Sequence, residues 1–180
     1  MALQDLLKTQ RDQLVAEWLA RIAACDPDPS SRLLKGDRDR FRNPIWYAYD
    51  QALPVVFDEV SGDMDRTRIA SALDPVMHIR TVEALSATDA TCFILLLKDV
   101  VRDALRNEPG EPTGFETWRA FGSRVDEVSL VAFDLFVACQ EKLKEIRASE
   151  ATRRAHLAER IAPIGTAPAT GGKQPAGNLG

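Results

Sequence analysis

Residues 118–146 read WRAFGSRVDEVSLVAFDLFVACQEKLKEI, and their apolar residues recur at intervals of three and four. This spacing lines apolar side chains along one side of a helix and is typical of a heptad seam. The stripe widens between residues 130 and 137, so we expect that part of the helix to pack inside a globule. The seam consists of Trp118, Phe121, Val125, Val128, Ala132, Leu135, Cys139, Leu143 and Ile146, and Val131, Phe133, Phe136 and Val137 widen it.

The seam narrows after residue 139, where charged residues dominate. Residues 141–160 hold four acidic and six basic residues. Mixed charges beside a narrow seam are typical of a helix that projects from a globule or pairs with a second subunit. We therefore predict a projecting helix end over residues 141–162 and a homodimer through this helix. The predicted dimer seam comprises Leu135, Cys139, Leu143 and Ile146.

Gly and Pro residues mark the C-terminal end of the predicted domain. Eight of the 18 residues from Pro163 to Gly180 are Gly or Pro, and this segment has no aromatic residue. Such a composition is typical of a flexible chain. We predict a single domain over residues 1–162 and a disordered tail over residues 163–180.

The remainder of the chain also shows helical periodicity. One apolar stripe predicts a helix over residues 3–24. Asn43–Pro44 has the residues of a helix start, with Asn as the N-cap and Pro at the first helical position. We expect this helix to run to Val60 with a kink before Pro54. The stripe of the first helix consists of Leu3, Leu6, Leu7, Leu14, Trp18 and Ile22.

Two further helix starts follow along the chain. A short helix is expected over residues 65–73, and Asp74–Pro75 predicts a new helix that runs to about Leu85. Ser86 and Asp89 resemble a capping box. The helix after that box, Thr88–Asn107, is apolar around most of its first half, so we expect it to be the central and most buried helix. The sequence therefore predicts an all-α fold of about six to seven helices.

Composition excludes several classes of protein. The 180 residues carry a formal net charge of −4, which argues against a nucleic-acid-binding protein. The N-terminus has no continuous apolar region of a signal peptide, and no apolar run reaches the ~20 residues of a membrane span. The three cysteines form no CxxC pair, so no zinc or iron–sulfur site is expected. Cys92 and Cys139 lie in apolar stretches, and we expect both to be buried thiols in a reducing cytoplasm.

Motifs of catalysis are not found in the sequence. It contains no GxGxxG, GxxxxGK[ST], GxSxG or HExxH string, and its only histidines are His78 and His156. Asp134 lies in an apolar context and is a candidate for a carboxylate with a shifted pKa, although an outward-facing or Arg-paired side chain is the favoured interpretation. We expect no enzyme activity and no cofactor.

Three strings carry a resemblance to a known family. They are RDRFRNPIWYAY (38–49), HIRTVEALSATDATCFILLLKDVVRDAL (78–105) and RVDEVSLVAFDLFVACQEKLKEIRASEATRR (124–154). Together they resemble the N-terminal domains of the RsbR-type co-antagonists of RsbT, over roughly residues 3–155. The resemblance implies a globin-like helical bundle without haem, which serves as an input module of general-stress signalling. The polar residues shared with the family motifs are Asn43, Arg80, Lys98, Asp134, Glu141 and Arg147.

The resemblance also implies partners. Members of this family often continue into a STAS domain, and the present sequence shows no βαβ pattern for one. We therefore expect action through protein contacts, with a STAS protein or a switch kinase as a regulatory partner in the cytoplasm. Arg80 would contact a partner or form a structural pair with Glu83 or Asp134, and we expect Lys98 to snorkel from its buried helix.

Two other functions remain open at this stage. The first is a sensor of haem or of a small molecule, with a pocket between the helices over residues 44–60, 75–85 and 88–107. His78 would be the haem ligand, but Trp46, Tyr47, Tyr49 and Phe57 could fill such a pocket, and the sequence favours a structural or surface histidine. The second is an accessory subunit of a metabolic complex.

Overall fold

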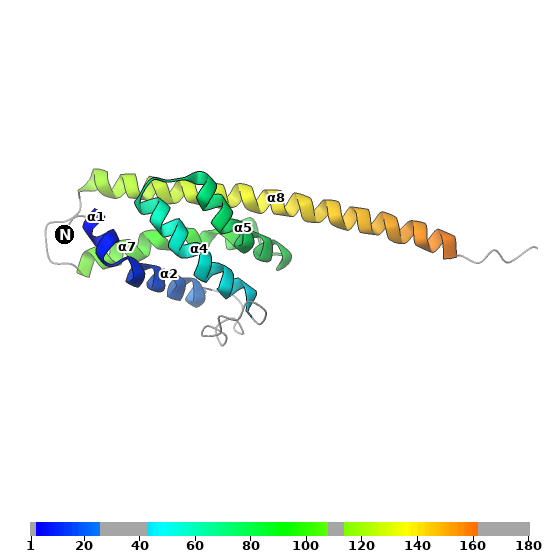
Figure 1. The fold of residues 1–180 in the computed structure, drawn as a ribbon, viewed down its shortest axis with the longest axis horizontal. Coiled ribbons are helices and arrows are strands. Elements are labelled where there is room, and N and C mark those ends of the chain that lie inside the picture. The colour runs from blue at the N-terminus through cyan, green and yellow to red at the C-terminus, as the bar shows by residue number, and fades with distance from the viewer. Residues whose placement is uncertain (1–2, 26–42, 108–113, 162–180) are drawn as a thin grey trace, which may run out of the picture. The chain divides into compact units, whose positions relative to one another are not determined.

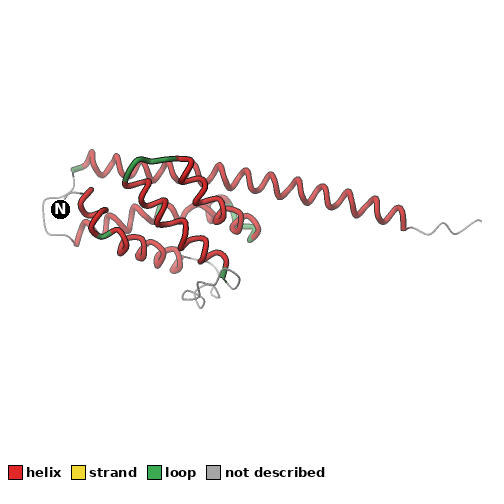
Figure 2. Tube along the Cα trace, in the orientation of Figure 1, coloured by secondary structure: helices red, strands yellow, loops and turns green. Residues whose placement is uncertain are grey.

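The computed structural model describes residues 3–25, 43–107 and 114–161. Helices and short turns account for all of these residues, with no strand among them (Figures 1 and 2). The all-α prediction and the long C-terminal helix are confirmed. The elements are α1 (Leu3–Thr9), α2 (Arg11–Cys25), α4 (Pro44–Ser61), α5 (Arg66–Val82), α6 (Ala87–Thr91), the 3₁₀ turn η1 (Cys92–Ile94), α7 (Leu96–Asn107) and α8 (Phe115–Ile161).

The chain divides into two units, Met1–Leu143 and Lys144–Gly180, with the boundary inside α8. The first unit contains the hydrophobic core. In the second unit, every residue from 144 to 158 is exposed. The predicted disordered tail over residues 163–180 lies outside the described residues. None of the described helices has both the length and the apolar character needed to cross a membrane.

The predicted N-terminal stripe is buried, but two helices carry it. Leu3, Leu6 and Leu7 of α1 and Leu14, Trp18 and Ile22 of α2 all lie in the core. A turn at Gln10 separates the helices, so the single helix predicted over residues 3–24 is wrong. The hydrogen bonds from Gln10 N to Leu6 O and from Leu14 N to Gln10 O keep helical spacing across the turn. The apolar residues of α1 and α2 therefore lie on one continuous face, despite the turn at Gln10.

The prolines inside α4 and α5 do not end these helices. α4 begins at Pro44 as predicted and runs through Pro54 to Ser61, where Gly62 forms its C-cap. α5 runs through Pro75, so the predicted restart at Asp74–Pro75 is wrong. Proline removes one backbone hydrogen bond, and α5, which continues through Pro75, packs against α4. The N-cap of α5 is instead Asp65, whose side chain accepts from the Thr67 and Arg68 amides.

The segment predicted as one helix over residues 88–107 is divided. Ser86 caps α6 and accepts a hydrogen bond from the Asp89 amide, as in a capping box. The turn η1 then separates α6 from α7. The buried Trp18 donates from Nε1 to the Phe93 carbonyl at 2.8 Å and so ties α2 to this turn.

This segment is also less buried than predicted. Leu95 is 44% exposed and Cys92 is exposed, because the 3₁₀ turn changes the direction of their side chains. The prediction of a buried Cys92 is therefore wrong, whereas Cys139 is buried. α4, with ten buried residues, is the more buried helix.

α8 contributes one side of its predicted stripe to the core. Its buried residues are Phe121, Val125, Val128, Ala132, Phe136 and Cys139. The prediction that Phe133 and Val137 pack inside is wrong, because both lie on the exposed side of the helix. Arg124 fixes α8 to the end of α4 by donating from Nη1 to the carbonyls of Val60 (2.9 Å) and Gly62 (2.7 Å). A cation at these carbonyls satisfies acceptors that a helix C-terminus leaves open.

Candidate functional site

A buried arginine lies in the last turn of α5. Arg80 of α5 is 6% exposed, and its Nε and Nη2 donate to the hydroxyl of Tyr49 at 3.0 and 2.8 Å. Glu83, one turn further along, accepts from Nη1 at 3.4 Å. The Tyr49 ring is itself fully buried and contacts the edge of Phe93 at a centroid distance of 5.0 Å. Burying a guanidinium requires such partners, because an unpaired charge in the core is costly.

This cluster agrees with one of the roles predicted for Arg80. The pair with Glu83 is present, and Asp134 lies exposed on α8. Sequence reasoning missed the hydroxyl of Tyr49, which is 31 positions away from Arg80. The apolar stripe around Tyr49 does not indicate that its hydroxyl binds an arginine. The hydrogen bonds to Tyr49 hold the Arg80 guanidinium in the core, so its positive charge is not presented to solvent.

Tyr49 also lines a cavity of about 540 Å³ between α2 and α4. The lining is mainly apolar, with a polar rim that includes Arg11, Asp12 and Asp50. Arg11 spans the two helices and donates from Nε and Nη2 to both carboxylate oxygens of Asp58, at 2.6 and 2.8 Å. The hydrogen bond to Asp58 is the main reason why the pKa of Arg11 is raised. The pocket predicted between residues 44–60, 75–85 and 88–107 stays a prediction.

Lys98 lies where α7 approaches α8. Its Nζ contacts Asp126 at 2.6 Å, with 29% of the lysine side chain exposed. A Cβ placed on Gly122 would be 3.8 Å from Lys98 Cε, so the lysine stem passes close to this glycine. Lys98 therefore snorkels as expected, and the ion pair adds a link between α7 and α8.

The other family-motif residues fall into two groups. Asn43 is buried at the N-cap position of α4, as predicted, but its side chain makes no capping hydrogen bond. Asp134, Glu141 and Arg147 are all exposed on α8. The partners described above for Arg80 and Lys98, namely Tyr49, Glu83 and Asp126, all lie outside the family-motif set.

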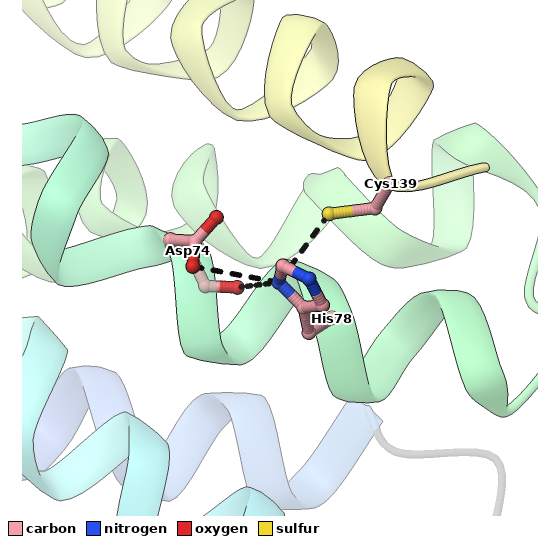
Figure 3. A group of neighbouring side chains, drawn as sticks. All are labelled: Asp74, His78 and Cys139. Atoms are coloured by element: carbon pink, nitrogen blue, oxygen red, sulfur yellow. Dashed lines mark hydrogen bonds and ion pairs between the residues drawn. The ribbon is translucent and has the colours of Figure 1, made fainter. Parts of the chain in front are cut away.

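His78 lies half-exposed on α5 and faces α8 (Figure 3). Its Nδ1 is 3.5 Å from Cys139 Sγ, 3.4 Å from Asp74 Oδ2 and 3.1 Å from the Asp74 carbonyl oxygen. Burial is the first cause that raises the pKa of the Cys139 thiol, and the charge of Asp74 adds to it.

The aromatic residues expected to fill a haem-like pocket differ in their exposure. Trp46, Tyr49 and Phe57 are buried, whereas Tyr47 is 38% exposed. The structure therefore places three of these side chains in the core.

The predicted dimer seam is partly used by the chain itself. Cys139 is buried in the core, Leu135 packs partly against that core, and Leu143 is half-buried. Ile146 is exposed. A second apolar row lies on the opposite, solvent side of α8, and we call Leu130, Phe133 and Val137 the outer row. These residues are spaced three and four apart and are 66%, 45% and 38% exposed.

Comparison with known proteins gives one finding. The sequence model of the family described as the RsbT co-antagonist protein rsbRD N-terminal domain matches residues 12–154. No curated protein and no solved structure matches the chain significantly.

Proposed function

The chain belongs to the rsbRD N-terminal domain family of RsbT co-antagonist proteins, and from this membership we propose that it is a non-enzymatic input module of stress-response regulation. In this proposal the chain works through protein contacts in the cytoplasm. The helices of the first unit supply a stable body, and α8 supplies the contact surface. A STAS protein or a switch kinase is the expected regulatory partner.

The observation that carries this proposal is the outer row of α8. Leu130, Phe133 and Val137 place large apolar side chains at heptad-like spacing on a solvent-facing helix side. A contiguous apolar row of this kind marks an interaction surface more often than a scattered exposed residue does. We propose that a second copy of the chain covers it.

Charge supports a second copy as the occupant. Residues 1–140 carry 16 basic and 23 acidic side chains, whereas residues 141–160 carry six basic and four acidic ones. Each copy therefore has a net acidic stretch and a net basic stretch of chain. Two copies can pair these opposite charges across a helix contact, which favours encounter and sets orientation.

Light scattering coupled to size exclusion tests the dimer. We expect the wild-type chain at tens of micromolar to have twice its mass of 19.9 kDa. Leu130→Asp should give the monomer mass, because a carboxylate in an apolar contact is costly. Val82→Asp is the matched control, since Val82 is 70% exposed on α5 and its replacement should leave the dimer intact.

Two results would contradict the proposed surface. A wild-type chain with the monomer mass would show that no dimer forms. A dimer that survives Leu130→Asp but dissociates in a Leu143→Asp/Ile146→Asp variant assigns the contact to the seam first predicted from the sequence.

The cavity between α2 and α4 favours a second candidate, a small-molecule sensor. Tyr49 lines it while its hydroxyl binds the buried Arg80, so an occupant would lie next to a fixed polar cluster. Native mass spectrometry of the purified chain tests this function. An added mass that Leu53→Trp abolishes supports it, whereas the bare chain mass argues against it.

A further inference from the structure

Three possible ligand atoms of different elements meet between α5 and α8. Asp74 and His78 lie one helical turn apart on α5, and Cys139 faces them from α8 (Figure 3). Their ligand atoms all lie within 4.8 Å of one another. All three residues belong to the first unit of the chain. We propose that Asp74, His78 and Cys139 bind one divalent transition-metal cation of the Zn²⁺ class through a carboxylate oxygen, Nδ1 and Sγ.

Two of the three separations agree with the edges of a tetrahedral site. With ordinary zinc bond lengths, tetrahedral geometry places a nitrogen and a sulfur ligand about 3.5 Å apart, and a nitrogen and an oxygen ligand about 3.3 Å apart. The observed distances from His78 Nδ1 are 3.5 Å to Cys139 Sγ and 3.4 Å to Asp74 Oδ2. The third edge, between the Asp74 carboxylate and Cys139 Sγ, lies within 4.8 Å. The exposed Asp74 side chain therefore has to adjust toward the tetrahedral value of about 3.5 Å when a cation enters.

Hydrogen bonding serves all of these contacts only if one Nδ1–H is shared between Asp74 and Cys139 Sγ, and thiol sulfur is a weak acceptor. An Nδ1 that carries a proton can donate to Asp74, but it then cannot accept from the Cys139 thiol. An Nδ1 without a proton can accept from the thiol, but it then has nothing to donate to the Asp74 oxygens. A cation placed among the three groups binds the nitrogen, the sulfur and the carboxylate together.

The ligand types indicate which metal suits the site, and the exposure of the ligands indicates how the metal reaches it. Thiolate and imidazole ligands suit Zn²⁺ and its neighbours, whereas Ca²⁺ and Mg²⁺ require mostly oxygen ligands. The side chains of His78 and Asp74 are 49% and 52% exposed, while Cys139 is 8% exposed beneath them. Solvent thus gives access to the cation and supplies a water as the fourth ligand. This inference is independent of the proposed function.

Cobalt(II) provides a direct spectroscopic probe of the site. The tag-free full chain, reduced and treated with a chelator, is titrated with Co²⁺ and then with Zn²⁺. We expect one equivalent of Co²⁺ to produce a thiolate-to-cobalt charge-transfer band, together with the intense d–d bands of four-coordination. One equivalent of Zn²⁺ should remove both and should raise Tm, since a ligand that binds only the folded chain stabilises it.

Substitutions then assign the ligands. Cys25→Ser/Cys92→Ser removes the two exposed cysteines and should leave the cobalt spectrum unchanged. Cys139→Ser should abolish the charge-transfer band. His78→Gln and Asp74→Asn should each weaken Zn²⁺ binding at least tenfold, because even the loss of a group that only supports a ligand costs about 10–100-fold. His156→Gln is the control for a histidine outside the site.

Two outcomes would overturn the proposal. A wild-type chain that gives no charge-transfer band holds a hydrogen-bonded triad only. A band that persists in Cys139→Ser, or disappears in Cys25→Ser/Cys92→Ser, places the metal on other cysteines. Circular dichroism of each metal-free variant shows whether it is folded, and Cys139→Ala provides a second variant if Cys139→Ser is not.

Discussion

α4 and residues 144–158 of α8 are helical segments of similar length in opposite surroundings. α4 has 18 residues and buries ten of them, including the ion-paired Glu59. Every residue from 144 to 158 is exposed. Packing supplies most of the stability of a helix in a protein, so α4 is held by its own chain. The exposed segment has only weak local support, such as the i,i+4 spacing of Glu150 and Arg154, worth about 0.2–0.5 kcal/mol.

Truncating one apolar residue in each segment should give the largest difference in the free energy of unfolding. Phe57 of α4 is 1% exposed, and Phe57→Ala should lower the free energy of unfolding by about 3–5 kcal/mol. Ile146→Ala should change it by no more than about 0.5 kcal/mol, because Ile146 is exposed. Denaturant titration of both variants at low protein concentration measures this. Equal losses would mean that residue 146 belongs to a packed core.

The Arg80 cluster should give the next largest effect. Tyr49→Phe removes the hydroxyl that accepts two Arg80 hydrogen bonds, while the guanidinium stays buried. We expect a loss of about 1–3 kcal/mol in the free energy of unfolding. Tyr47→Phe, at a 38% exposed position of the same helix, should cost less than about 0.5 kcal/mol. A Tyr49→Phe variant as stable as wild type would show that water replaces the hydroxyl.

A glycine in the exposed segment should act locally. Ala151→Gly disfavours the helix by about 1 kcal/mol at that position. Amide hydrogen exchange should speed up around residue 151, while the midpoint of global unfolding stays the same. Ala52→Gly in α4 is the matched change at a buried position and should lower global stability. Equal global effects would indicate that the two segments unfold together.

The smallest effect should come from a partly exposed ion pair between α2 and α7. Arg21 hydrogen-bonds Asp103 at 3.0 Å, which is the main reason why the pKa of Asp103 is lowered from 3.8. A carboxyl whose folded pKa is lowered stabilises the protein above its unfolded pKa. This contribution is lost as pH falls through the lower, folded value. The stability difference between wild type and Asp103→Asn should therefore shrink from pH 6 to pH 3, and a difference that grows would contradict the pairing.

Helical periodicity was enough to predict most of the fold. The buried faces of α1, α2 and α8 follow from apolar residues at intervals of three and four. The wrong predictions lie where tertiary packing overrides the local sequence signal. Pro75 looked like a helix start, but α5 continues through it. The apolar run at 92–97 covers all sides of a helix, so its pattern could not show that η1 turns Cys92 and Leu95 outward.

The sites were less predictable, because their contacts join distant residues. Arg80 was identified as important, but its partner Tyr49 lies on another helix. His78 was considered as a haem ligand or as a structural or surface histidine, and Cys139 as a buried thiol of the seam. Their approach depends on how α5 and α8 pack, and they are 61 positions apart. A single sequence carries no signal for such a pairing.

The contact between Arg124 and the end of α4 also sets an order of events in folding. It joins positions 60 and 124, so a loop of 64 residues must close before it forms. Contacts between α4 and α5 span far shorter loops and can form earlier. Arg124→Gln should therefore leave the refolding rate nearly unchanged and speed up unfolding, as stopped-flow kinetics would show. Slower refolding would instead place the docking of α8 in the folding nucleus.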